Sequence, residues 1–430
     1  MSKLQELINK LCPNGVEFKP LGEVFEMRNG YTPSKNNPDF WEGGTIPWFR
    51  MDDIRENGRI LSDSIQHITP SAIKGKGLFE ANSFILTTTA TIGEHALIIA
   101  DSLANQRFTN LKVRKSLSNL LVTKFIYYYM FIVDDFCKRN TNVSGFASVD
   151  MDKLKKMPFP IPPIEVQEEI VRILDSFSDY AAELQAELQA RKQQYEYYRN
   201  LLLTFNPSAY GCGTDDEQKD GVTTWGRHNY KIQWKKLGEI GTFIRGNGLQ
   251  KKDFSESGVG CIHYGQIYTH YGTFATKTKS FVSEKLASKL LKIENGDIVL
   301  ACTSENIEDV AKAVAWLGKE TIVTGGHSVV FKHTANPKYI AYFMQTALFF
   351  NQKKRYAYGA KVIDIKTEDL AKILIPIPPL ELQEKIVAIL DRFETLVNDL
   401  TNGLPAEIAT VKDQYEYYRN KLLTFKKLSA

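Results

Sequence analysis

Two separate parts of the sequence carry short runs that mix basic, amide and aromatic side chains with glycine. In the N-terminal part these runs are "RNGYTPSK" (28–35), "RMDDIRENGR" (50–59) and "KGKG" (74–77). In the C-terminal part they are "RGNGLQKKD" (245–253), "HYGQIYTHYG" (263–272), "TGGHS" (324–328) and "KKRYAYGAK" (353–361). Basic side chains attract phosphates; in a DNA major groove Arg and Lys also pair with guanine, and Asn and Gln pair with adenine. These residue types therefore point to contacts with nucleic acid.

The individual candidates for DNA contact fall into one set for each part. The first set is Arg28, Asn29, Tyr31, Ser34, Lys35, Arg50, Arg55, Lys74, Lys76 and Arg107. The second set is Arg245, Asn247, Gln250, Lys251, Lys252, Tyr264, Gln266, Tyr268, His270, His327, Lys353, Lys354, Arg355, Tyr358 and Lys361. A solvated surface charge or a turn is the alternative for any single one, and Tyr264, Tyr268 and Tyr271 are equally compatible with strands that pack a core. The prediction rests on the clustering of these residues.

Sequence motifs of the common catalytic sites are missing. There is no GxxxxGK[ST] run for phosphate binding, no glycine fingerprint in a βαβ setting and no HExxH pair for zinc. An adenine methyltransferase would show (N/D)PP(F/Y), whereas "NPSAY" at 206–210 lacks the second proline. The five cysteines are scattered without a CxxC pair, which favours neither disulfides nor zinc and suits a reducing cytoplasm. We therefore expect no catalytic residue, metal or cofactor in this chain.

The charge is unevenly distributed along the chain, although the formal total is only +4. Residues 1–160 have a net charge of +3 and residues 231–376 a net charge of +8, whereas the remaining segments together have −7. Basic segments separated by acidic ones are typical of two nucleic-acid-binding ends on a spacer. For residues 1–160 alone, +3 is also an ordinary surface charge.

An internal repeat links the two parts. "IPPIEVQEEIVRILDSF" (161–177) and "IPPLELQEKIVAILDRF" (377–393) share 12 of 17 positions. "QYEYYRNLLLTF" (194–205) and "QYEYYRNKLLTF" (414–425) share 11 of 12. A weaker likeness joins "FKPLGEVFEMRNG" from Phe18 to "WKKLGEIGTFIRGNG" from Trp234. The chain is therefore a variable lobe followed by a nearly constant segment, written twice.

Each constant segment predicts a long helix after a run of prolines. The prolines at 158–163 and 375–379 favour an extended lead-in, because they fix φ and lack a backbone donor. After the first run, apolar residues recur at heptad spacing from Ile170 to Phe205, interrupted by Arg191, and a helix of 42 residues would be roughly 60 Å long. The second copy carries four more residues, and Gly403 and Pro405 predict a kink or break there. A tandem "AELQAELQ" occupies 182–189 of the first helix.

These patterns predict an α+β protein with five segments. They are a first mixed α/β domain (1–160), a first helix (161–206), an exposed linker (207–230), a second mixed α/β domain (231–376) and a second helix with a possible break near 402–405 (377–430). Because each long seam needs a partner, we expect the two helices to form a coiled coil, antiparallel if a pseudo-twofold axis relates the halves.

Two tyrosines of the repeated heptapeptide fall off the helix–helix seam. Tyr195, Tyr198, Tyr415 and Tyr418 lie on the seam, whereas Tyr197 and Tyr417 do not. We predict that Tyr197, Arg199, Tyr417 and Arg419 dock partner proteins. Packing of the two off-seam rings against the adjacent lobe is the equal alternative.

The repeated segments "IPIPP", "LQEKIVAILDRF" and "QYEYYRNKLLTF", with the opening "LCPNGVEFKPLGEV" (11–24), resemble the specificity subunit of Type I restriction–modification enzymes. The resemblance spans the chain, and it is strong in the helical segments and weak in the lobes. It implies two target-recognition domains, each contacting half of a bipartite, asymmetric site in double-stranded DNA, with a non-catalytic and cytoplasmic role.

The resemblance also implies partners. Two modification subunits would bind S-adenosylmethionine and methylate adenine, and restriction subunits would use ATP and Mg²⁺. No membrane is expected, because no stretch of 18 apolar residues is present. The alternative function is a coiled-coil scaffold that binds proteins and does not recognise DNA.

Overall fold

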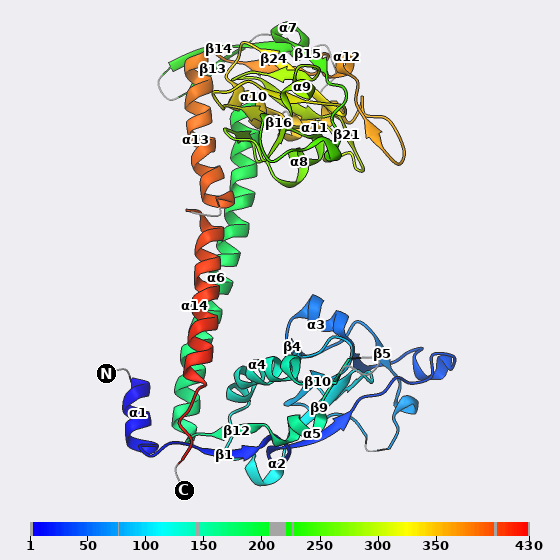
Figure 1. The fold of residues 1–430 in the computed structure, drawn as a ribbon, viewed down its shortest axis with the longest axis vertical. Helices are drawn as coiled ribbons and strands as arrows, with labels where there is room; N and C mark the ends of the chain where they lie inside the picture. The colour runs from blue at the N-terminus through cyan, green and yellow to red at the C-terminus, as the bar shows by residue number, and fades with distance from the viewer. Residues whose placement is uncertain are drawn as a thin grey trace. The chain divides into compact units, whose positions relative to one another are not determined.

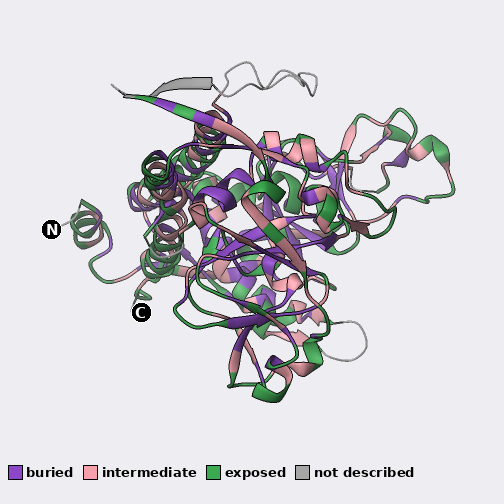
Figure 2. Cartoon of the chain, turned by 90° about the horizontal axis from the view of Figure 1, so that it is seen from above, coloured by how far each residue is buried: buried purple, intermediate pink, exposed green. Residues whose placement is uncertain are grey.

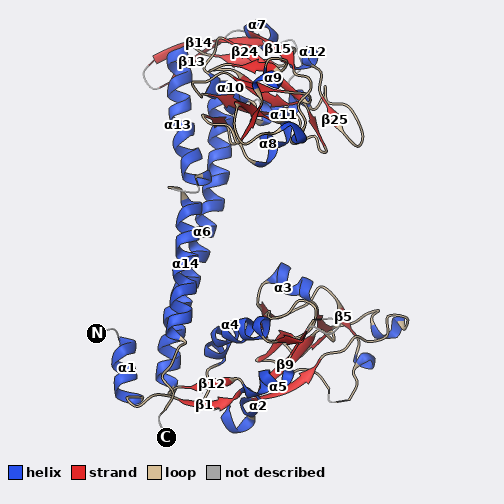
Figure 3. Ribbon diagram, viewed as in Figure 1, coloured by secondary structure: helices blue, strands red, loops and turns tan. Residues whose placement is uncertain are grey.

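The chain forms two compact units, each with one lobe of strands and short helices (Figures 1 and 3). Unit 1 comprises residues 1–183 and 408–430, and unit 2 comprises residues 184–407. The computed structural model describes residues 3–75, 77–142, 147–205, 221–225, 228–399 and 402–428. Buried positions concentrate on the strands of the lobes, whereas the loops are largely exposed (Figure 2).

The lobe of unit 1 is built on a five-stranded sheet in the order β2-β9-β6-β7-β4. The elements are α1 (Lys3–Leu11), β1 (Glu17–Pro20), α2 (Leu21–Val24), β2 (Phe25–Asn29), β3 (Ile46–Phe49), α3 (Met51–Asn57), β4 (Ile60–Leu61), β5 (His67–Ile68), β6 (Ser83–Thr87), β7 (His95–Ile98), β8 (Leu103–Ala104), β9 (Phe108–Val113), α4 (Thr123–Arg139), β10 (Thr141–Asn142), β11 (Ser148–Val149), α5 (Met151–Lys156), β12 (Pro158–Ile161) and α6 (Ile164–Thr204), with short 3₁₀ turns at Pro38–Phe40, Pro70–Ala72 and Lys115–Leu117. Strand β6 is buried on both faces, because Phe84 and Leu86 face a core shared with α4 while Ile85 faces a second core.

The lobe of unit 2 repeats this topology. Its elements are β13 (Gly221–Trp225), β14 (His228–Lys236), α7 (Leu237–Ile240), β15 (Gly241–Arg245), β16 (Val259–Ile262), α8 (Tyr264–Thr269), β17 (Phe274–Ala275), β18 (Ser280–Val282), α9 (Glu284–Ala287), β19 (Leu291–Ile293), β20 (Ile298–Ala301), β21 (Thr303–Ser304), β22 (Lys312–Trp316), β23 (Ile322–Thr324), β24 (Ser328–His333), α10 (Pro337–Phe343), α11 (Ala347–Lys353), β25 (Ile363–Asp364), α12 (Thr367–Leu370), β26 (Leu374–Ile377) and α13 (Leu380–Asn398), with a 3₁₀ turn at Lys251–Asp253. The last helix, α14 (Leu404–Leu422), lies mostly in unit 1. The main sheet has the order β15-β24-β20-β22-β17, with one parallel pair at β22–β17, as β7–β4 is in unit 1. The two lobes are therefore one fold with different sequences.

The predicted linker range of 207–230 overlaps the strands β13 and β14 at its C-terminal end. Residues 206–220 lie outside the described part of the chain, but β13 and β14 form an antiparallel hairpin. Strand β14 continues into the lobe and pairs with β26, where Gln233 lies opposite Ile377. Strand β14 therefore begins at His228 inside the hairpin, and its pairing with the lobe begins at Gln233.

The proline runs form strands, as the predicted extended lead-in requires. Strand β12 pairs with β1 in unit 1, and β26 pairs with β14 in unit 2. Each strand ends where a long helix begins, with α6 at Ile164 and α13 at Leu380. The pairing therefore anchors the start of each helix to its lobe.

Within each unit, α6 packs against the second copy of the repeat. In unit 1, Phe177 stacks on Tyr418 with ring centroids 5.5 Å apart, and α6 and α14 run in opposite directions (Figure 1). In unit 2, Tyr195 and Tyr198 stack on Phe393 at 6.3 and 5.6 Å. These contacts lie on the predicted seam, and the predicted fold class with two mixed lobes and paired antiparallel helices is confirmed.

The second repeat is broken into two helices, α13 and α14. Helix α13 ends at Asn398, and the N–H of Gly403 donates to the Asp399 carbonyl at 3.1 Å. A Cβ at Gly403 would lie 2.4 Å from the Thr395 carbonyl oxygen, so only glycine allows this close approach. The predicted break near 402–405 is therefore confirmed.

Among the described helices, none combines the length and apolar character needed to cross a bilayer.

Candidate nucleic-acid interface

In unit 1 the loop after β2 is held against two other candidate segments. The Tyr31 N–H donates to the Ala104 carbonyl at 2.9 Å, and the Tyr31 hydroxyl accepts from the Lys74 N–H at 2.8 Å. The Thr32 hydroxyl donates to the Gln106 side chain. The exposed Asn29, Ser34, Lys35, Lys74 and Arg107 therefore belong to neighbouring loops of one lobe. Lys76 lies outside the described residues.

Helix α3 adds two arginines next to these loops. The Asn105 N–H donates to the Phe49 carbonyl at 3.1 Å, which brings the start of α3 beside the turn that carries Arg107. Arg50 and Arg55 both lie near the carboxylate of Asp52, at 3.7 and 3.8 Å. Arg55 is 63% exposed, so its guanidinium stays accessible.

Arg28 lies apart from this set. Side chains alternate along a strand, so Arg28 and Asn29 point to opposite faces of β2. The Arg28 guanidinium lies 4.5 Å over the Phe79 ring, in a groove of about 490 Å³ that Glu26, Glu80 and Lys112 also line. Partial burial lowers the pKa of the Arg28 guanidinium.

In unit 2 the corresponding loops converge around β21 and β25. The glycine-rich loop after β15 contacts the β23–β24 turn, where the Gly326 N–H donates to the Gly248 carbonyl at 3.2 Å. The Tyr264 and His327 rings lie 5.1 Å apart and line a pocket of about 410 Å³ with Tyr268 and the 303–309 loop. Arg245 forms a bidentate pair with Asp364 at 2.8 and 3.4 Å.

Most other candidates of unit 2 are exposed. The exposed members are Asn247, Gln250, Lys251, Lys252, His270, Lys354, Arg355, Tyr358 and Lys361. Gln250 to Lys252 lie on the 3₁₀ turn after the glycine-rich loop, and Tyr358 lies opposite Asp364 in a β-bridge. These positions place the side chains at the surface of the lobe.

Two further candidates of unit 2, Gln266 and Tyr268, have structural partners. Gln266 accepts from the His263 N–H at 3.1 Å and donates to the Ser280 hydroxyl at 2.7 Å, which caps α8. The Tyr268 hydroxyl donates to the Thr303 carbonyl at 2.7 Å. Tyr264 and Tyr268 lie on helix α8 and pack, partly buried, against the core that contains the buried Tyr271. The alternative of core packing therefore holds for all three tyrosines, although none of them lies on a strand.

Lys353 is a correction to the predicted set. It ends α11 with only 4% of its surface exposed, and its ammonium donates to the carbonyls of Glu308 and Val310 at 2.7 and 2.6 Å. A side chain satisfied by two buried carbonyls cannot extend to DNA in this fold. The neighbours Lys354 and Arg355 are the exposed members of the run.

Replacing Lys353 by Ala is expected to destabilise the protein by about 2 kcal/mol, because one buried and one partly buried carbonyl lose their donor and the stem leaves a cavity. Burial lowers the pKa of this ammonium to about 8. The folded protein therefore binds the Lys353 proton less tightly than the unfolded chain does. As the pH rises from 8 towards 10.5, the free energy of unfolding of the parent protein should increase relative to that of Lys353→Ala. Thermal unfolding of both proteins across this range measures the margin. Lys354→Ala is the exposed control, and an equal loss for both variants would contradict the interior role.

The four predicted docking residues separate into two kinds. The rings of Tyr197 and Tyr417 are 56% and 59% exposed, so they do not pack against a lobe in the described structure. Arg199 instead donates to the Gln345 side chain at 3.2 Å, and Arg419 lies 4.4 Å over the Phe131 ring. The arginines therefore tie each helix to the lobe of its own unit, and the tyrosines remain the candidates for docking.

Tyr417 lines an apolar groove of about 740 Å³ in unit 1 together with Leu4, Ile173, Phe177 and Leu422. Helix α1 forms one wall, because Lys3 pairs with Glu169 of α6 at 2.8 Å. Arg172 and Lys3 hold the pKa of the Glu169 carboxyl at about 2. The wall is therefore fixed by an ion pair that persists at neutral pH.

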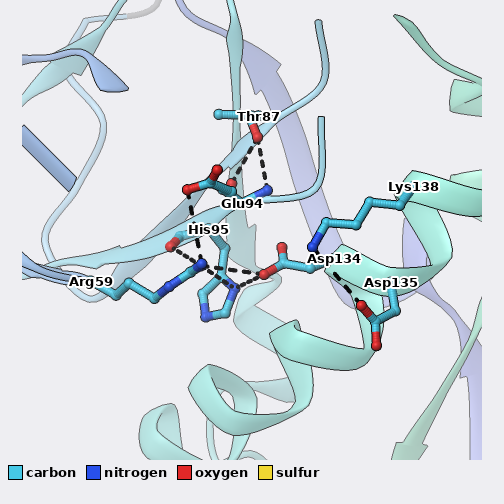
Figure 4. Close-up of polar contacts among 7 residues, drawn as sticks. All are labelled: Arg59, Thr87, Glu94, His95, Asp134, Asp135 and Lys138. Atoms are coloured by element: carbon cyan, nitrogen blue, oxygen red, sulfur yellow. Dashed lines mark hydrogen bonds and ion pairs between the residues drawn. The ribbon is translucent and has the colours of Figure 1, made fainter. Parts of the chain in front are cut away.

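A buried polar network fixes α4 against the main sheet of unit 1 (Figure 4). The His95 Nδ1 lies 2.7 Å from the Asp134 carboxylate, and Arg59 donates to the His95 carbonyl at 3.0 Å. Burial lowers the pKa of the His95 imidazole. A neutral imidazole then donates from Nδ1 to Asp134, and the network joins β7, α4 and the residue before β4.

Comparison with known proteins gives the same division of the chain. The family model described as "Type I restriction modification DNA specificity domain" matches residues 13–191 and 230–410. The chain belongs to this family. A relative named Type I restriction enzyme EcoprrI specificity subunit, from Escherichia coli, is 37% identical over 429 residues, covering 96% of this chain and 94% of the relative. The Type I restriction enzyme MjaIX specificity subunit of Methanocaldococcus jannaschii is 24% identical over 402 residues, covering 90% and 89%.

Solved structures support the fold of this specificity-domain family. A chain from a structure on complex assembly and conformational transition of the type I R-M system has a TM-score of 0.60 at 15% identity, covering 96% of this chain and 98% of that one. The HsdS subunit from Thermoanaerobacter tengcongensis has a TM-score of 0.51 at 15% identity, covering 96% and 97%. These likenesses show the fold, and the family model with the 37% identical relative confirms the predicted family resemblance.

Several residues at the candidate interface of this family member were missed from the sequence. They are Gln106 in unit 1 and Thr303, Ser304, Glu305, Asn306, Asp309, Val362 and Asp364 in unit 2. The polar run "TSEN" directly after the buried strand β20 is a signal that marks a loop at a sheet edge. Asp364 has no such signal, because its partner Arg245 is 119 positions away.

Proposed function

We propose that this chain is the DNA-recognising subunit of a Type I restriction–modification complex and that each lobe contacts one half of a bipartite, asymmetric site. The observation that carries the proposal is the repeated topology: two lobes share one fold and place different basic, amide and aromatic side chains on the corresponding loops. One fold with two different loop sets suits two different half-sites.

The helices support assembly with other proteins. We propose that two modification subunits dock on the repeated helices and bring S-adenosylmethionine and adenine methylation, and that restriction subunits using ATP and Mg²⁺ complete the nuclease. This chain contributes recognition and no catalytic group. Among the described residues, no group of three His, Cys, Asp or Glu side chains has the arrangement of a metal site.

Joining two modest half-site contacts in one chain raises the affinity for a properly spaced pair. The second contact becomes intramolecular, at an effective concentration that the connecting helices determine. A site with both halves at the right spacing is then bound far more tightly than either half alone.

Binding of the assembled complex to duplex DNA tests the proposal. If each lobe contributes about three phosphate contacts, raising the salt from 50 to 200 mM should weaken binding roughly 10³-fold. Mapping methylated adenines in cells that carry the complex should then give one bipartite sequence with unequal halves. A complex that assembles but neither binds duplex DNA nor methylates a defined sequence would instead support the protein-only scaffold.

A further inference from the structure

Asn29 and Arg245 occupy the same structural position in the two lobes. Each ends the first strand of the main sheet and precedes a glycine whose N–H donates to the first residue of the neighbouring strand at 2.9 Å, Phe108 in unit 1 and Ser328 in unit 2. The two glycines, Gly30 and Gly246, are equally constrained, since a Cβ on either would lie 2.3–2.4 Å from a carbonyl oxygen of the adjacent turn. Both preceding side chains are exposed.

In unit 2 the position carries a guanidinium that Asp364 holds from one side. Asp364 Oδ2 and Oδ1 lie 2.8 and 3.4 Å from Arg245 Nη2 and Nη1. The planar guanidinium has five N–H groups, and Asp364 uses one N–H of Nη1 and one of Nη2. The edge formed by the Nε–H and the second N–H of Nη2 therefore remains for a ligand. Among the described residues no partner occupies that edge, and 41% of the side chain is exposed.

Asp364 is itself fixed in place. Strand β25 pairs with β21, where Thr303 lies opposite Asp364. The backbone of Asp364 also exchanges hydrogen bonds with that of Tyr358 at 2.8 and 3.0 Å. The Arg245 edge is therefore pre-oriented, which reduces the entropy lost when it binds.

In unit 1 the same position carries an amide that a threonine orients. The Thr109 hydroxyl donates to Asn29 Oδ1 at 2.9 Å and lies 3.0 Å from the Thr88 hydroxyl. The Thr88 hydroxyl also lies 3.5 Å from the Arg107 carbonyl, so Thr88 has two acceptors within reach. With Oδ1 facing the Thr109 hydroxyl, Asn29 keeps the amide N–H₂ and one lone pair of Oδ1 for a ligand.

From this geometry we infer that Asn29 and Arg245 are base-recognising residues at equivalent positions, Asn29 selecting an A·T pair in one half-site and Arg245 a G·C pair in the other. A paired N–H edge matches guanine O6 and N7, and an oriented amide matches adenine N6 and N7. Asp364 and Thr109 act as positioning residues. The inference rests on the proposed function and specifies the bases for it.

The test is methylation of a duplex library with randomised half-sites by the complex assembled with its modification subunits. Arg245→Lys and Asp364→Asn should each lower the preference for G·C at one position of one half-site, roughly 5- to 150-fold for loss of the bidentate contact, with the other half-site unchanged. Asn29→Asp and Thr109→Val should lower the preference for A·T at one position of the opposite half-site. Lys319→Ala, an exposed lysine in the β22–β23 turn, is the matched control.

Three outcomes separate the possibilities. If Arg245→Lys and Asn29→Asp lower methylation of all sequences by the same factor, both residues contact phosphates and the inference is overturned, while the proposed function stands. Parental G·C preference in Asp364→Asn would overturn the positioning role of Asp364. If the parental complex assembles without any sequence preference, the proposed function itself fails.

Discussion

Deleting one "AELQ" from the tandem at 182–189 is expected to change the preferred spacer between the half-sites by one or two base pairs and to leave both half-site sequences unchanged. Helix α6 is continuous from Ile164 to Thr204, and the tandem lies where unit 1 passes into unit 2. Four helical residues correspond to a rise of about 6 Å, compared with about 3.4 Å per base pair of DNA. The deletion alters the connection and neither lobe.

The deletion preserves the seam, which is why the variant should fold. Leu184 and Leu188 are both buried and occupy the same place in the two copies of the tetrapeptide. One of these two leucines remains after the deletion, and its distance along the helix from the seam residues on one side shortens by about one turn. Mapping methylated adenines gives the spacer directly. Gln185→Ala, an exposed change of unaltered length, is the control, and methylation of the parental spacing by the deletion variant would show that α6 is no ruler.

Replacing Tyr197 and Tyr417 together by Ala is expected to weaken binding of the modification subunits by at least roughly 30-fold. Tyrosines at the centre of an interface often contribute about 2 kcal/mol or more each. Both rings are more than half exposed, so their loss should cost this protein little stability. Titration of the purified chain with the modification subunit measures the affinity, and thermal unfolding confirms the fold.

A matched control uses the same helix. Tyr180 of α6 is 44% exposed and lies outside the repeated heptapeptide, so Tyr180→Ala should leave the affinity near the parental value. The single Tyr417→Ala variant tests the groove of unit 1 by itself. An unchanged affinity in the double variant would eliminate docking through these rings.

The constant frame could be predicted because its signals are local. Prolines block helix and favour strand edges, heptad spacing specifies a buried stripe, and a glycine two positions before a proline interrupts that stripe. The predicted helix at 161–206 is α6 at Ile164–Thr204, and the predicted break lies between α13 and α14. Each of these features depends on residues within a few turns of one another.

The candidate interface could be predicted only in outline. The run "KKRYAYGAK" suggested four equivalent cations, but Lys353 faces the interior because it lies in the last turn of α11, where two carbonyls of the 308–310 loop need a donor. A charge run does not reveal which member lies on the buried side of a helix. Similarly, Arg28 and Asn29 are neighbours in sequence and point to opposite faces of β2.

The sequence by itself determined the duplicated frame, the family, the break in the second helix and the basic character of the lobes, because repeats, periodicity and charge are properties of the chain. The offset of 216 between the repeats already places Asn29 opposite Arg245, and only the tertiary structure decided that Thr109 and Asp364 orient them. Those pairings join residues 80 and 119 positions apart. The physical reason is that hydrogen-bond partners are chosen by the folding of the sheet, which brings distant strands side by side and leaves no local pattern to mark them.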